Sequence, residues 1–485
     1  MAGTRFVDEL TSKGRNSCKV TVFGEEPHGG YNRVLLPGLL AGDQAPSDVV
    51  THPPSWYRER KVDLRMGVRV VRIDRSRKTV HTADGTVTPY DILVLATGST
   101  PYLPEIDGLA YGAGQLKSGI FTFRTLDDCQ RIIEFGSKAR RVAILGGGFL
   151  GLEAASALRA RNLEIHIVHA GGHLMDSQLD TTAGSMLADA MERKGIHIHL
   201  GQRTNRIEGD SHVKGIGFAD GTTLECDLLV VAAGVRPNVE LAQNAGLAVR
   251  RGVLVNDDLS SQTDAAICAV GECAEHRGVT PGLVGPTWEQ ARVLAERLGG
   301  VSPAATYQGS PHSTHLKVAG VDLAMIGEPR SDDISEEVLT YTDQKRAIYR
   351  RLVARGGRLS GAVLFGAGED SPALSDAVEL GSTLRWDGVL TPTTAGASPA
   401  GGVVAMSETK VVCNCSGVTE GQILAAVKSG ARNVEAVTRA TRAGSGCGGC
   451  RPQIQSLLAD GRQAGPPLKE SASPGGKRLA WLLGA

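Results

Sequence analysis

The chain has 485 residues, which is more than one hydrophobic core can organise, and this length predicts three or four domains. Its 52 basic residues balance its 52 acidic residues, so small molecules or proteins are expected as partners rather than nucleic acid or an anionic membrane. No apolar run approaches the roughly 18 residues of a membrane span, and the start lacks a secretory signal, which predicts a cytoplasmic location.

The first ten residues, MAGTRFVDEL, look like the last third of a dinucleotide-binding G-x-G-x-x-G motif, because Gly3 directly precedes an amphipathic run. No strand stands before Gly3, and the first two glycines of the motif are absent. Two interpretations stay open from these residues alone: an ordinary amino terminus, or a chain that starts inside the motif.

Five apolar runs predict buried strands, and helical stretches alternate with them. The strands cover residues 18–24, 91–98, 140–148, 163–170 and 227–234, and two of the helices cover 151–162 and 181–195. Continuous apolar runs are typical of strands that are covered on both faces. Their alternation with helices predicts parallel sheets in a doubly wound α/β fold.

The segment RVAILGGGFLGLEAA places Gly146, Gly148 and Gly151 at G-x-G-x-x-G spacing between an apolar strand and a small-residue helix. The first glycine allows a tight turn, the second lets the backbone approach a pyrophosphate, and the third lets the helix pack closely on the strand. The unpaired N–H groups at the start of the helix then face the phosphates. This context favours dinucleotide binding over a glycine-rich turn in an unrelated α/β protein.

The next strand ends at His169, where an acidic residue would bind a ribose 2′-hydroxyl and an arginine cluster would bind a 2′-phosphate. No arginine follows before Arg193, which favours NADH without excluding NADPH. His169 is either a ribose contact or a polar strand end.

Beyond residue 300 the pattern changes. Short alternating strands between 306 and 388 predict a smaller α+β domain. Residues 389–408 are rich in Gly, Ala, Pro and Thr with almost no charge, and we expect them to form a flexible linker. A compact module follows at 409–462, and we expect a disordered tail at 463–485.

Two further strand ends, at Thr97 and Gly98 and at Gly234, flank the central dinucleotide unit. One dinucleotide fold inserted into another in this way resembles the FAD-dependent pyridine-nucleotide oxidoreductases over residues 1 to about 385. The segments VFGEEPHGGYNRVLLPGLLAG, HLMDSQLD and AVGECAEHRGVTPGLVGPTWEQA are similar to those of nitrite reductase large subunits and assimilatory nitrate reductase electron-transfer subunits. The resemblance implies an FAD domain at 1–110 and 231–300, and an NAD(P)-binding domain at 111–230.

The same resemblance implies which residues contact FAD. Glu25 or Glu26 would bind the adenosine ribose, and Arg33 would lie near the flavin. A helix beginning at WEQA, which contains Glu289, would direct its positive end at the flavin. The remaining assigned residues are Thr97, Gly98 and Gly234 in the FAD cleft, and Gly271 and Glu272 near the ribityl chain, where the superfamily usually has Asp.

The nine cysteines are an odd number and do not suggest a disulfide framework. The chain lacks the reactive cysteine pair of disulfide reductases, and NRVLLPGLLAG holds no cysteine of the peroxidase-like kind. We expect Cys268 and Cys273 to be buried structural thiols. Electrons must therefore leave the flavin by another route.

Four cysteines cluster near the carboxyl end, with Cys413 and Cys415 in C-x-C and Cys447 and Cys450 in C-x-x-C. Two such pairs around a helical stretch can close on one centre, either tetrahedral zinc or a [2Fe–2S] cluster, and their spacing separates the two poorly. The intervening helices and the closing TRAGSGCGGC resemble the bacterioferritin-associated ferredoxin type of [2Fe–2S] domain, which favours iron. A one-electron cluster would also dispense singly the two electrons that a hydride delivers to flavin.

Together these features predict an NAD(P)H-dependent oxidoreductase with FAD and one [2Fe–2S] cluster. By resemblance its acceptor would be a nitrate or nitrite reductase catalytic subunit, and the chain could form a homodimer. The sequence ends soon after Cys450, before any sirohaem-binding domain, so we expect an electron-transfer subunit or the reductase half of a nitrite reductase. A zinc-bound interaction module on a flavin redox sensor and the release of iron from ferritin stay open as alternatives.

In the family that the chain resembles, the FAD motif starts with a strand and two phosphate-facing glycines, and Gly3 matches only its last glycine. We therefore expect this chain to lack the first strand of its flavin site, with a start farther upstream or with weak FAD binding.

Overall fold

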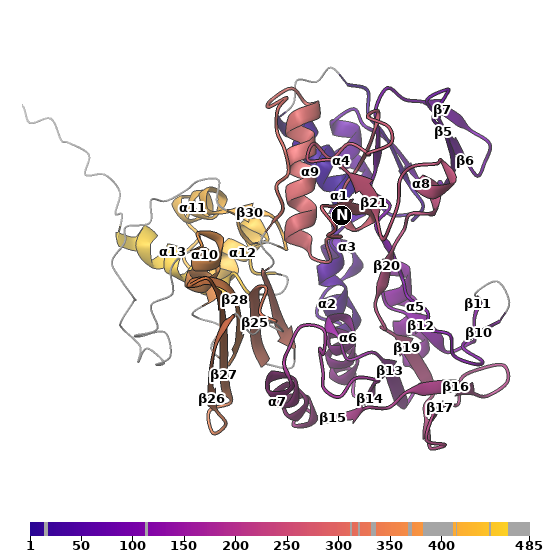
Figure 1. The fold of residues 1–485 in the computed structure, drawn as a ribbon, viewed down its shortest axis with the longest axis vertical. Helices are drawn as coiled ribbons and strands as arrows, with labels where there is room; N and C mark the ends of the chain where they lie inside the picture. Colours follow the sequence, from indigo (N-terminus) through magenta and orange to yellow (C-terminus); the bar gives the residue numbers. More distant parts are fainter. Residues whose placement is uncertain are drawn as a thin grey trace, which may run out of the picture.

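The computed structural model describes residues 1–13, 18–111, 115–310, 313–318, 321–330, 336–366, 371–381, 411–413, 415–445 and 448–463. Two nucleotide-binding folds form one half of the molecule, and an antiparallel sheet and a helical module pack beside them (Figure 1). The predicted fold class is confirmed.

The first domain contains short parallel ladders and two helices that pack on one another, α1 (Ala2–Lys13) and α9 (Val284–Leu298). Strand β1 (Thr21–Gly24) pairs in parallel with β4 (Asp63–Met66), and β8 (Leu93–Leu95) pairs in parallel with β22 (Ile267–Ala269). Within the described residues no further strand joins these two ladders. The edges of β1 and β8 both line the cavity described below.

The other elements of this domain are short. They are β2 (Gly30–Tyr31), η1 (Arg33–Leu35), α2 (Leu36–Ala41), α3 (Pro46–Val49), β3 (Val50–His52), α4 (Pro54–Glu59), β5 (Val70–Asp74), β6 (Thr79–Thr82), β7 (Val87–Pro89), β9 (Ser99–Pro101), β20 (Val235–Pro237), α8 (Glu240–Asn244), β21 (Val253–Val255), η3 (Gly271–Cys273) and β23 (Ala274–His276).

The second domain is built on a five-stranded parallel sheet in the order β12–β19–β13–β14–β15. Its strands are β12 (Ile120–Thr122), β13 (Arg141–Leu145), β14 (Glu164–His169), β15 (Ile196–Leu200) and β19 (Leu228–Val231), and its helices are α5 (Leu126–Gly136), α6 (Phe149–Ala160) and α7 (Thr181–Glu192). Ile144 and Ile167 are fully buried. The continuous apolar runs therefore predicted strands with both faces covered.

An antiparallel layer accompanies this sheet. It consists of β16 (Thr204–Glu208), β17 (Gly215–Phe218) and β18 (Thr223–Glu225), with the small hairpin β10 (Ala110–Tyr111) and β11 (Gln115–Leu116) nearby. Phe218 and Ile216 of β17 share a core with Val168 of the parallel sheet. One face of the parallel sheet is thus covered by this layer.

The third domain is a five-stranded antiparallel sheet in the order β24–β25–β28–β27–β26, with α10 (Ser371–Glu379) packed on β25 and β28. Its strands are β24 (Ser313–Val318), β25 (Val321–Gly327), β26 (Glu337–Asp343), β27 (Ile348–Arg355) and β28 (Arg358–Phe365). Tyr349 and Phe365 belong to the same buried core as Ile144 of the second domain. The Tyr349 hydroxyl donates to Asp180, which caps α7, so the two domains are joined by polar and apolar contacts.

The fourth unit is a helical module with β29 (Val411–Cys413), β30 (Val418–Thr419), α11 (Glu420–Lys428), α12 (Val434–Thr441) and α13 (Arg451–Gln463). Ile423, Val437 and Ile454, one from each helix, are fully buried together. The first two helices lie where the sequence predicts them, whereas α13 was not predicted. The expected linker at 389–408 lies outside the described residues, and so does the expected tail except for Gln463.

One helix boundary differs from the prediction. Helix α9 begins at Val284, four residues before the WEQA segment, because Gly285 and Pro286 are accommodated in its first turn. Glu289 therefore lies in the second turn rather than at the positive end of the helix. None of the helices in the described part of the chain combines the length and the apolar character needed to cross a membrane.

Candidate functional site

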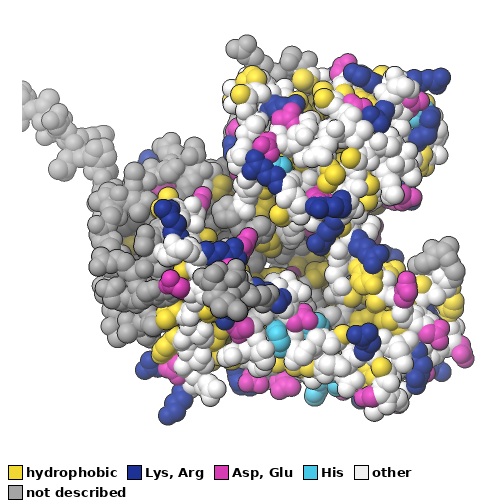
Figure 2. Space-filling view, viewed as in Figure 1, with side chains coloured by type: hydrophobic (Ala, Val, Ile, Leu, Met, Phe, Trp, Pro, Cys, Tyr) yellow, Lys and Arg dark blue, Asp and Glu magenta, His cyan; other side chains and the backbone are white. Residues whose placement is uncertain are grey.

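One large cavity of about 3600 Å³ lies among the two nucleotide-binding folds and the helical module. The space-filling view shows the surface hollowed between the upper lobe, which holds α9 and β5–β7, and the lower lobe, which holds β13–β15 (Figure 2). The predicted site residues on its lining are Gly3, Glu25, Glu26, Arg33, Thr97, Gly98, Gly146, Gly148, His169, Gly234, Glu272, Glu289, Cys413, Cys415 and Cys450. Residues far apart in the sequence thus converge on one space.

Gly146 and Gly148 lie in the turn from β13 into α6, called the fingerprint turn below, and Gly151 lies in the first turn of α6; these three are the fingerprint glycines. A Cβ atom on Gly146 would lie 2.3 Å from the carbonyl oxygen of Ala232, and one on Gly151 would lie 2.0 Å from the carbonyl oxygen of Gly146. Only glycine fits at these two positions. Gly148 is the N-cap residue of α6, and a Cβ there would meet nothing within 4 Å, so the backbone at this point is open to a ligand in the cavity.

His169 at the end of β14 packs against the fingerprint turn. Its Nδ1 accepts a hydrogen bond from the Gly147 N–H at 3.3 Å, and its Nε2 lies 3.4 Å from an oxygen of Asp176. The ring is therefore held in place at the cavity wall, with its Nε2 atom buried.

The two acidic candidates after β1 differ in their surroundings. Glu26 accepts a hydrogen bond from the Tyr31 hydroxyl at 2.5 Å and pairs with Arg33, and burial raises the pKa of Tyr31 to about 12. Glu25 is exposed, and its nearest cation, Arg69, lies 3.7 Å away. Of the two carboxylates, Glu25 is the one with capacity for a ribose, while Glu26 holds Arg33 beside the cavity.

At the ends of β8 and β22, polar groups gather around Glu272. Its carboxylate accepts a hydrogen bond from the Ser99 hydroxyl at 2.9 Å and pairs with Arg124, neither of which was predicted from the sequence. Thr97 donates from its hydroxyl to the carbonyl of Asn238 at 2.7 Å. Glu272 is thus positioned by two partners at the cavity wall.

The remaining predicted positions are glycines and Glu289. Gly98 and Gly234 adopt φ angles of 68° and 110° in the turns after β8 and β19. Gly271 donates its N–H to Gln290 at 2.8 Å, and a Cβ there would lie 2.7 Å from Ala2, so the start of α1 sits tightly against η3. Glu289 pairs with Arg292 at 2.6 Å in α9, and this pair occupies its carboxylate.

The cysteines of the helical module are close enough to share a centre. The sulfur atoms of Cys413 and Cys415 lie 3.6 Å apart, and both side chains are buried together with Cys450. Two thiolates at about 2.3 Å from one tetrahedral metal ion lie about 3.8 Å apart, so this spacing fits a metal centre. The fourth predicted ligand, Cys447, lies outside the described residues.

Neighbouring thiols favour the thiolate form of Cys413. Hydrogen bonds from Cys415 and Cys450 lower its pKa, and this favours the thiolate form that metal ions bind. By contrast, Cys268 and Cys273 are fully buried in the first domain, and burial raises the pKa of each thiol. Both are buried, as expected, and their structural role stays a prediction.

The helical module docks on the rim of the cavity through one buried hydrogen bond. The Asn32 side-chain N–H donates to the backbone carbonyl of Cys415 at 2.9 Å. Val34, two residues on, packs against the core of the module. Asn32 is not among the predicted site residues, because an Asn before an apolar run indicates a helix cap and nothing in the local sequence indicates a bond to residue 415.

A second contact supports this docking. Gly417 adopts a φ of 63°, and a Cβ there would lie 2.5 Å from the Trp288 ring and 2.6 Å from an Arg5 nitrogen. The Arg5 guanidinium lies over the same ring, 5.1 Å from its centroid. Glycine at this position lets the turn that holds Cys415 and Gly417, called the cysteine turn below, approach α1 and α9 closely.

Comparisons with known proteins agree with this arrangement. Residues 1–295 match the pyridine nucleotide-disulphide oxidoreductase family, residues 313–382 match the rubredoxin NAD+ reductase C-terminal domain, and residues 411–460 match the BFD-like [2Fe-2S] binding domain. These families indicate FAD, NAD(P)H and a [2Fe–2S] cluster, as predicted from the sequence.

Among curated proteins, the chain is 36% identical to a nitrite reductase [NAD(P)H] of Bacillus subtilis (strain 168), over 94% of this chain and 56% of that protein. It is also 36% identical to the assimilatory nitrate reductase electron transfer subunit of the same organism, over 94% of this chain and 58% of the relative. The chain thus spans little more than half the length of these relatives.

Solved structures with the same fold include a ferredoxin reductase for the CYP199A2 system from Rhodopseudomonas palustris. It is 26% identical, has a TM-score of 0.71, and the match covers 79% of this chain and 93% of that one. The water-forming NADH oxidase of Lactobacillus brevis shares the fold at a TM-score of 0.71 and 21% identity, over 79% and 89% of the two chains. By the match over residues 1–295, the chain is an oxidoreductase that belongs to the pyridine nucleotide-disulphide oxidoreductase family.

Proposed function

We propose that this chain passes electrons from NAD(P)H through FAD and a [2Fe–2S] cluster to the catalytic part of a nitrate or nitrite reductase in nitrogen assimilation. The observation that carries the proposal is the hydrogen bond from Asn32 to the Cys415 carbonyl, which fixes the cysteine turn at the rim of the nucleotide cavity. A cluster held there is adjacent to the flavin side of the cavity.

The nucleotide sites follow from the lining residues. Gly146 and Gly148 on the cavity lining would bind the pyrophosphate of the nicotinamide dinucleotide, with Gly151 packing the start of α6 against the turn, and His169 would lie beside the adenosine ribose. The missing arginines after β14 favour NADH. FAD held there would supply a ring that can take up the two electrons of a hydride and give them up singly.

The flavin nucleotide is bound by the first domain. Glu25 would accept hydrogen bonds from the adenosine ribose, and Arg33, held by Glu26, would supply a positive charge near the ring system. Glu272, fixed by Ser99 and Arg124, accepts from the ribityl chain. Gly3, Thr97, Gly98 and Gly234 on the cavity lining would supply further contacts, whereas Gly271 packs against the start of α1 and Glu289 is paired with Arg292.

Cys413, Cys415 and Cys450 would hold the cluster, with Cys447 as the fourth thiolate. The sulfur spacing and the lowered pKa of Cys413 support this ligand set. Burial among apolar side chains limits water access, which is one means of setting a cluster potential.

The physiological acceptor is proposed from the relatives, whose names are nitrite reductase and nitrate reductase electron transfer subunit. The two are equally similar to this chain, so both kinds of catalytic subunit are candidates. We propose a cytoplasmic location and allow for a homodimer.

The test uses the purified full chain. Iron and zinc analysis with a visible spectrum should show FAD and two iron atoms per chain, with cluster absorbance that bleaches when NADH is added. Zinc without iron, or bleaching of the flavin alone, would overturn the electron-transfer proposal in favour of a zinc-bound module. Adding nitrate or nitrite reductase catalytic subunits to the NADH-reduced protein then shows which one reoxidises it; reoxidation by neither would refute the proposed acceptor.

A further inference from the structure

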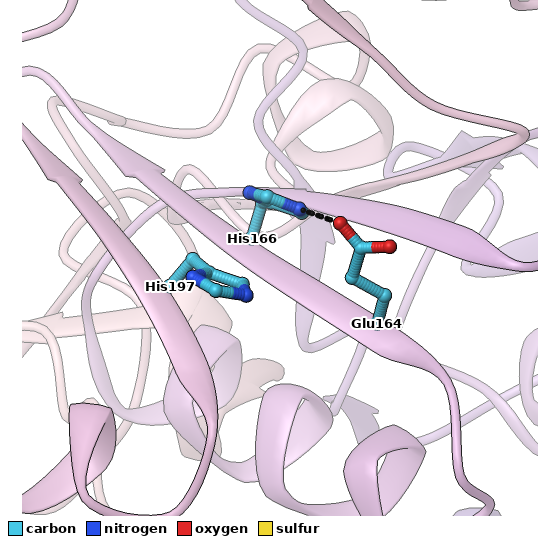
Figure 3. Close-up of side chains that lie close together, drawn as sticks. All are labelled: Glu164, His166 and His197. Carbon is cyan, nitrogen blue, oxygen red and sulfur yellow. Dashed lines mark hydrogen bonds and ion pairs between the residues drawn. The ribbon is translucent and has the colours of Figure 1, made fainter.

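A histidine cluster lies on the second domain, away from the fingerprint turn. Glu164 and His166 are two residues apart on β14, so their side chains project from the same face, and His197 of β15 is the register partner of His166 (Figure 3). Glu164 pairs in register with Arg141, the first residue of β13, whereas the fingerprint turn follows the last residue of that strand. The cluster is therefore at the opposite end of the sheet from the nucleotide.

The three side chains bring their polar atoms together. One ligand atom from each of Glu164, His166 and His197 lies within 4.8 Å of the other two. The His166 Nε2 and a Glu164 oxygen are 2.9 Å apart, and the rings of His166 and His197 stack with centroids 4.7 Å apart. Glu164 and His197 are exposed, so an ion can enter from solvent.

A fourth residue, His199, is hydrogen-bonded to His166 of this cluster. The His166 Nδ1 lies 3.0 Å from the Nε2 of His199, which projects from the same face of β15. A metal-binding histidine commonly donates its other ring N–H to a nearby acceptor, and this bond fixes the tautomer and the ring orientation. His199 can accept that bond when the Nε2 of His166 binds an ion.

We propose that Glu164, His166 and His197 form a binding site for a divalent transition metal ion of the zinc type, with His199 orienting His166. Imidazole and carboxylate are the ligands that such ions take together, and three protein ligands leave a fourth position for water. This site is separate from the four-cysteine centre and from the nucleotide cavity.

The rearrangement that binding requires is small. Ligand atoms around a tetrahedral zinc ion lie roughly 3.3 Å apart, since each is about 2.0 Å from the metal, so the side chains must rotate inward. Glu164 would give up its 3.0 Å contact with Arg141, which retains Glu225 at 3.4 Å. The two bonded imidazoles switch tautomers through solvent and stay neutral, so no net proton is lost.

The experiment is titration of the oxidised full-length holoprotein with Zn²⁺ by isothermal calorimetry, with the cysteine centre already filled by its cluster. We expect one binding event in the wild type, a loss of affinity of about tenfold in His199→Gln, which removes the orienting partner, and a larger loss in His197→Gln and Glu164→Gln. His212→Gln, an exposed histidine elsewhere in the same domain, is the matched control and should bind as the wild type does.

Circular dichroism of each variant without metal checks that it folds, and a variant that does not fold is replaced by the corresponding alanine variant. A Zn²⁺-dependent rise in melting temperature that disappears in His197→Gln would support the site independently. No binding event in the wild type, or an event that persists unchanged in both His197→Gln and Glu164→Gln, would overturn the proposal.

Discussion

Replacing Asn32 by alanine removes the side chain that donates to the Cys415 carbonyl across the junction between the first domain and the helical module. Both residues are buried, so the carbonyl loses its partner without gaining water. Leaving a buried acceptor unpaired costs about 2 kcal/mol, within a usual range of about 1–3. At about 1.4 kcal/mol per factor of ten, the docked arrangement becomes roughly thirtyfold less favoured.

The consequence is a specific change in electron transfer. Asn32 does not touch the fingerprint glycines, so NADH should reduce the flavin at the wild-type rate in Asn32→Ala. Reduction of the cluster should slow by up to about thirtyfold, and backbone amides of residues 415–428 should exchange hydrogen faster. Stopped-flow absorbance separates the two reductions, and mass spectrometry measures the exchange.

Two variants separate docking from capping. The Asn32 side chain also accepts from the Val34 N–H at 3.1 Å and caps η1, a role that Asn32→Ser retains although serine is too short to reach Cys415. Asn433 caps α12 in the same way, accepting from Ala436 at 2.8 Å in an exposed position, so Asn433→Ala is the matched control. Cluster reduction and exchange that stay at wild-type values in both Asn32 variants would refute the reasoning.

Three further changes test other parts of the molecule. Gly151→Ala places a Cβ 2.0 Å from a backbone carbonyl, so the affinity for NADH in a binding titration should fall at least about tenfold with FAD content unchanged, whereas Gly172→Ala, in open space, should bind normally. Cys413→Ser should abolish cluster absorbance but leave NADH-dependent reduction of ferricyanide by the flavin, whereas exposed Cys18→Ser should keep both; a retained cluster in Cys413→Ser would contradict the ligand assignment. Burial lowers the pKa of His52 from 6.5 to about 4, so its neutral form stabilises the fold above pH 6.5 and this stability is lost as the pH falls towards 4. Between pH 8 and pH 5, the unfolding free energy of the wild type should fall by about 2 kcal/mol more than that of His52→Gln. Urea unfolding at each pH measures this free energy, and an equal fall in the two proteins would disprove the assignment.

The elements that could be predicted from the sequence are those specified by local pattern. The apolar run of β13 and the glycines after it are consecutive, and the clash at Gly151 is with the turn that the same segment forms. The start of α9 was misplaced because Gly285 and Pro286 are typical of a loop, yet proline is tolerated in a first turn, where its missing N–H has no partner to lose.

The contacts that could not be predicted join residues that are distant in the chain. Arg124 reaches Glu272 from the second domain, and Asn32 reaches Cys415 across most of the sequence. Each is a common polar residue whose partner is set only when domains pack. No spacing rule encodes such a pair, so the sequence predicts separate motifs and does not predict that they line one cavity.

Residues 31–34 of the first domain contact both the second domain and the helical module. The Tyr31 hydroxyl accepts from the backbone N–H of Leu126, at the start of α5 in the second domain, and donates to the carboxylate that holds Arg33. Asn32 bonds the cysteine turn, and Val34 packs on the core of the helical module. Because these residues are covalent neighbours, we expect a shift of the second domain at Tyr31 to displace the Asn32 side chain from Cys415. Tyr31→Phe, which deletes only the hydroxyl, should therefore slow cluster reduction as well as loosen the start of α5, whereas an effect confined to α5 in hydrogen exchange would show that the two contacts act independently.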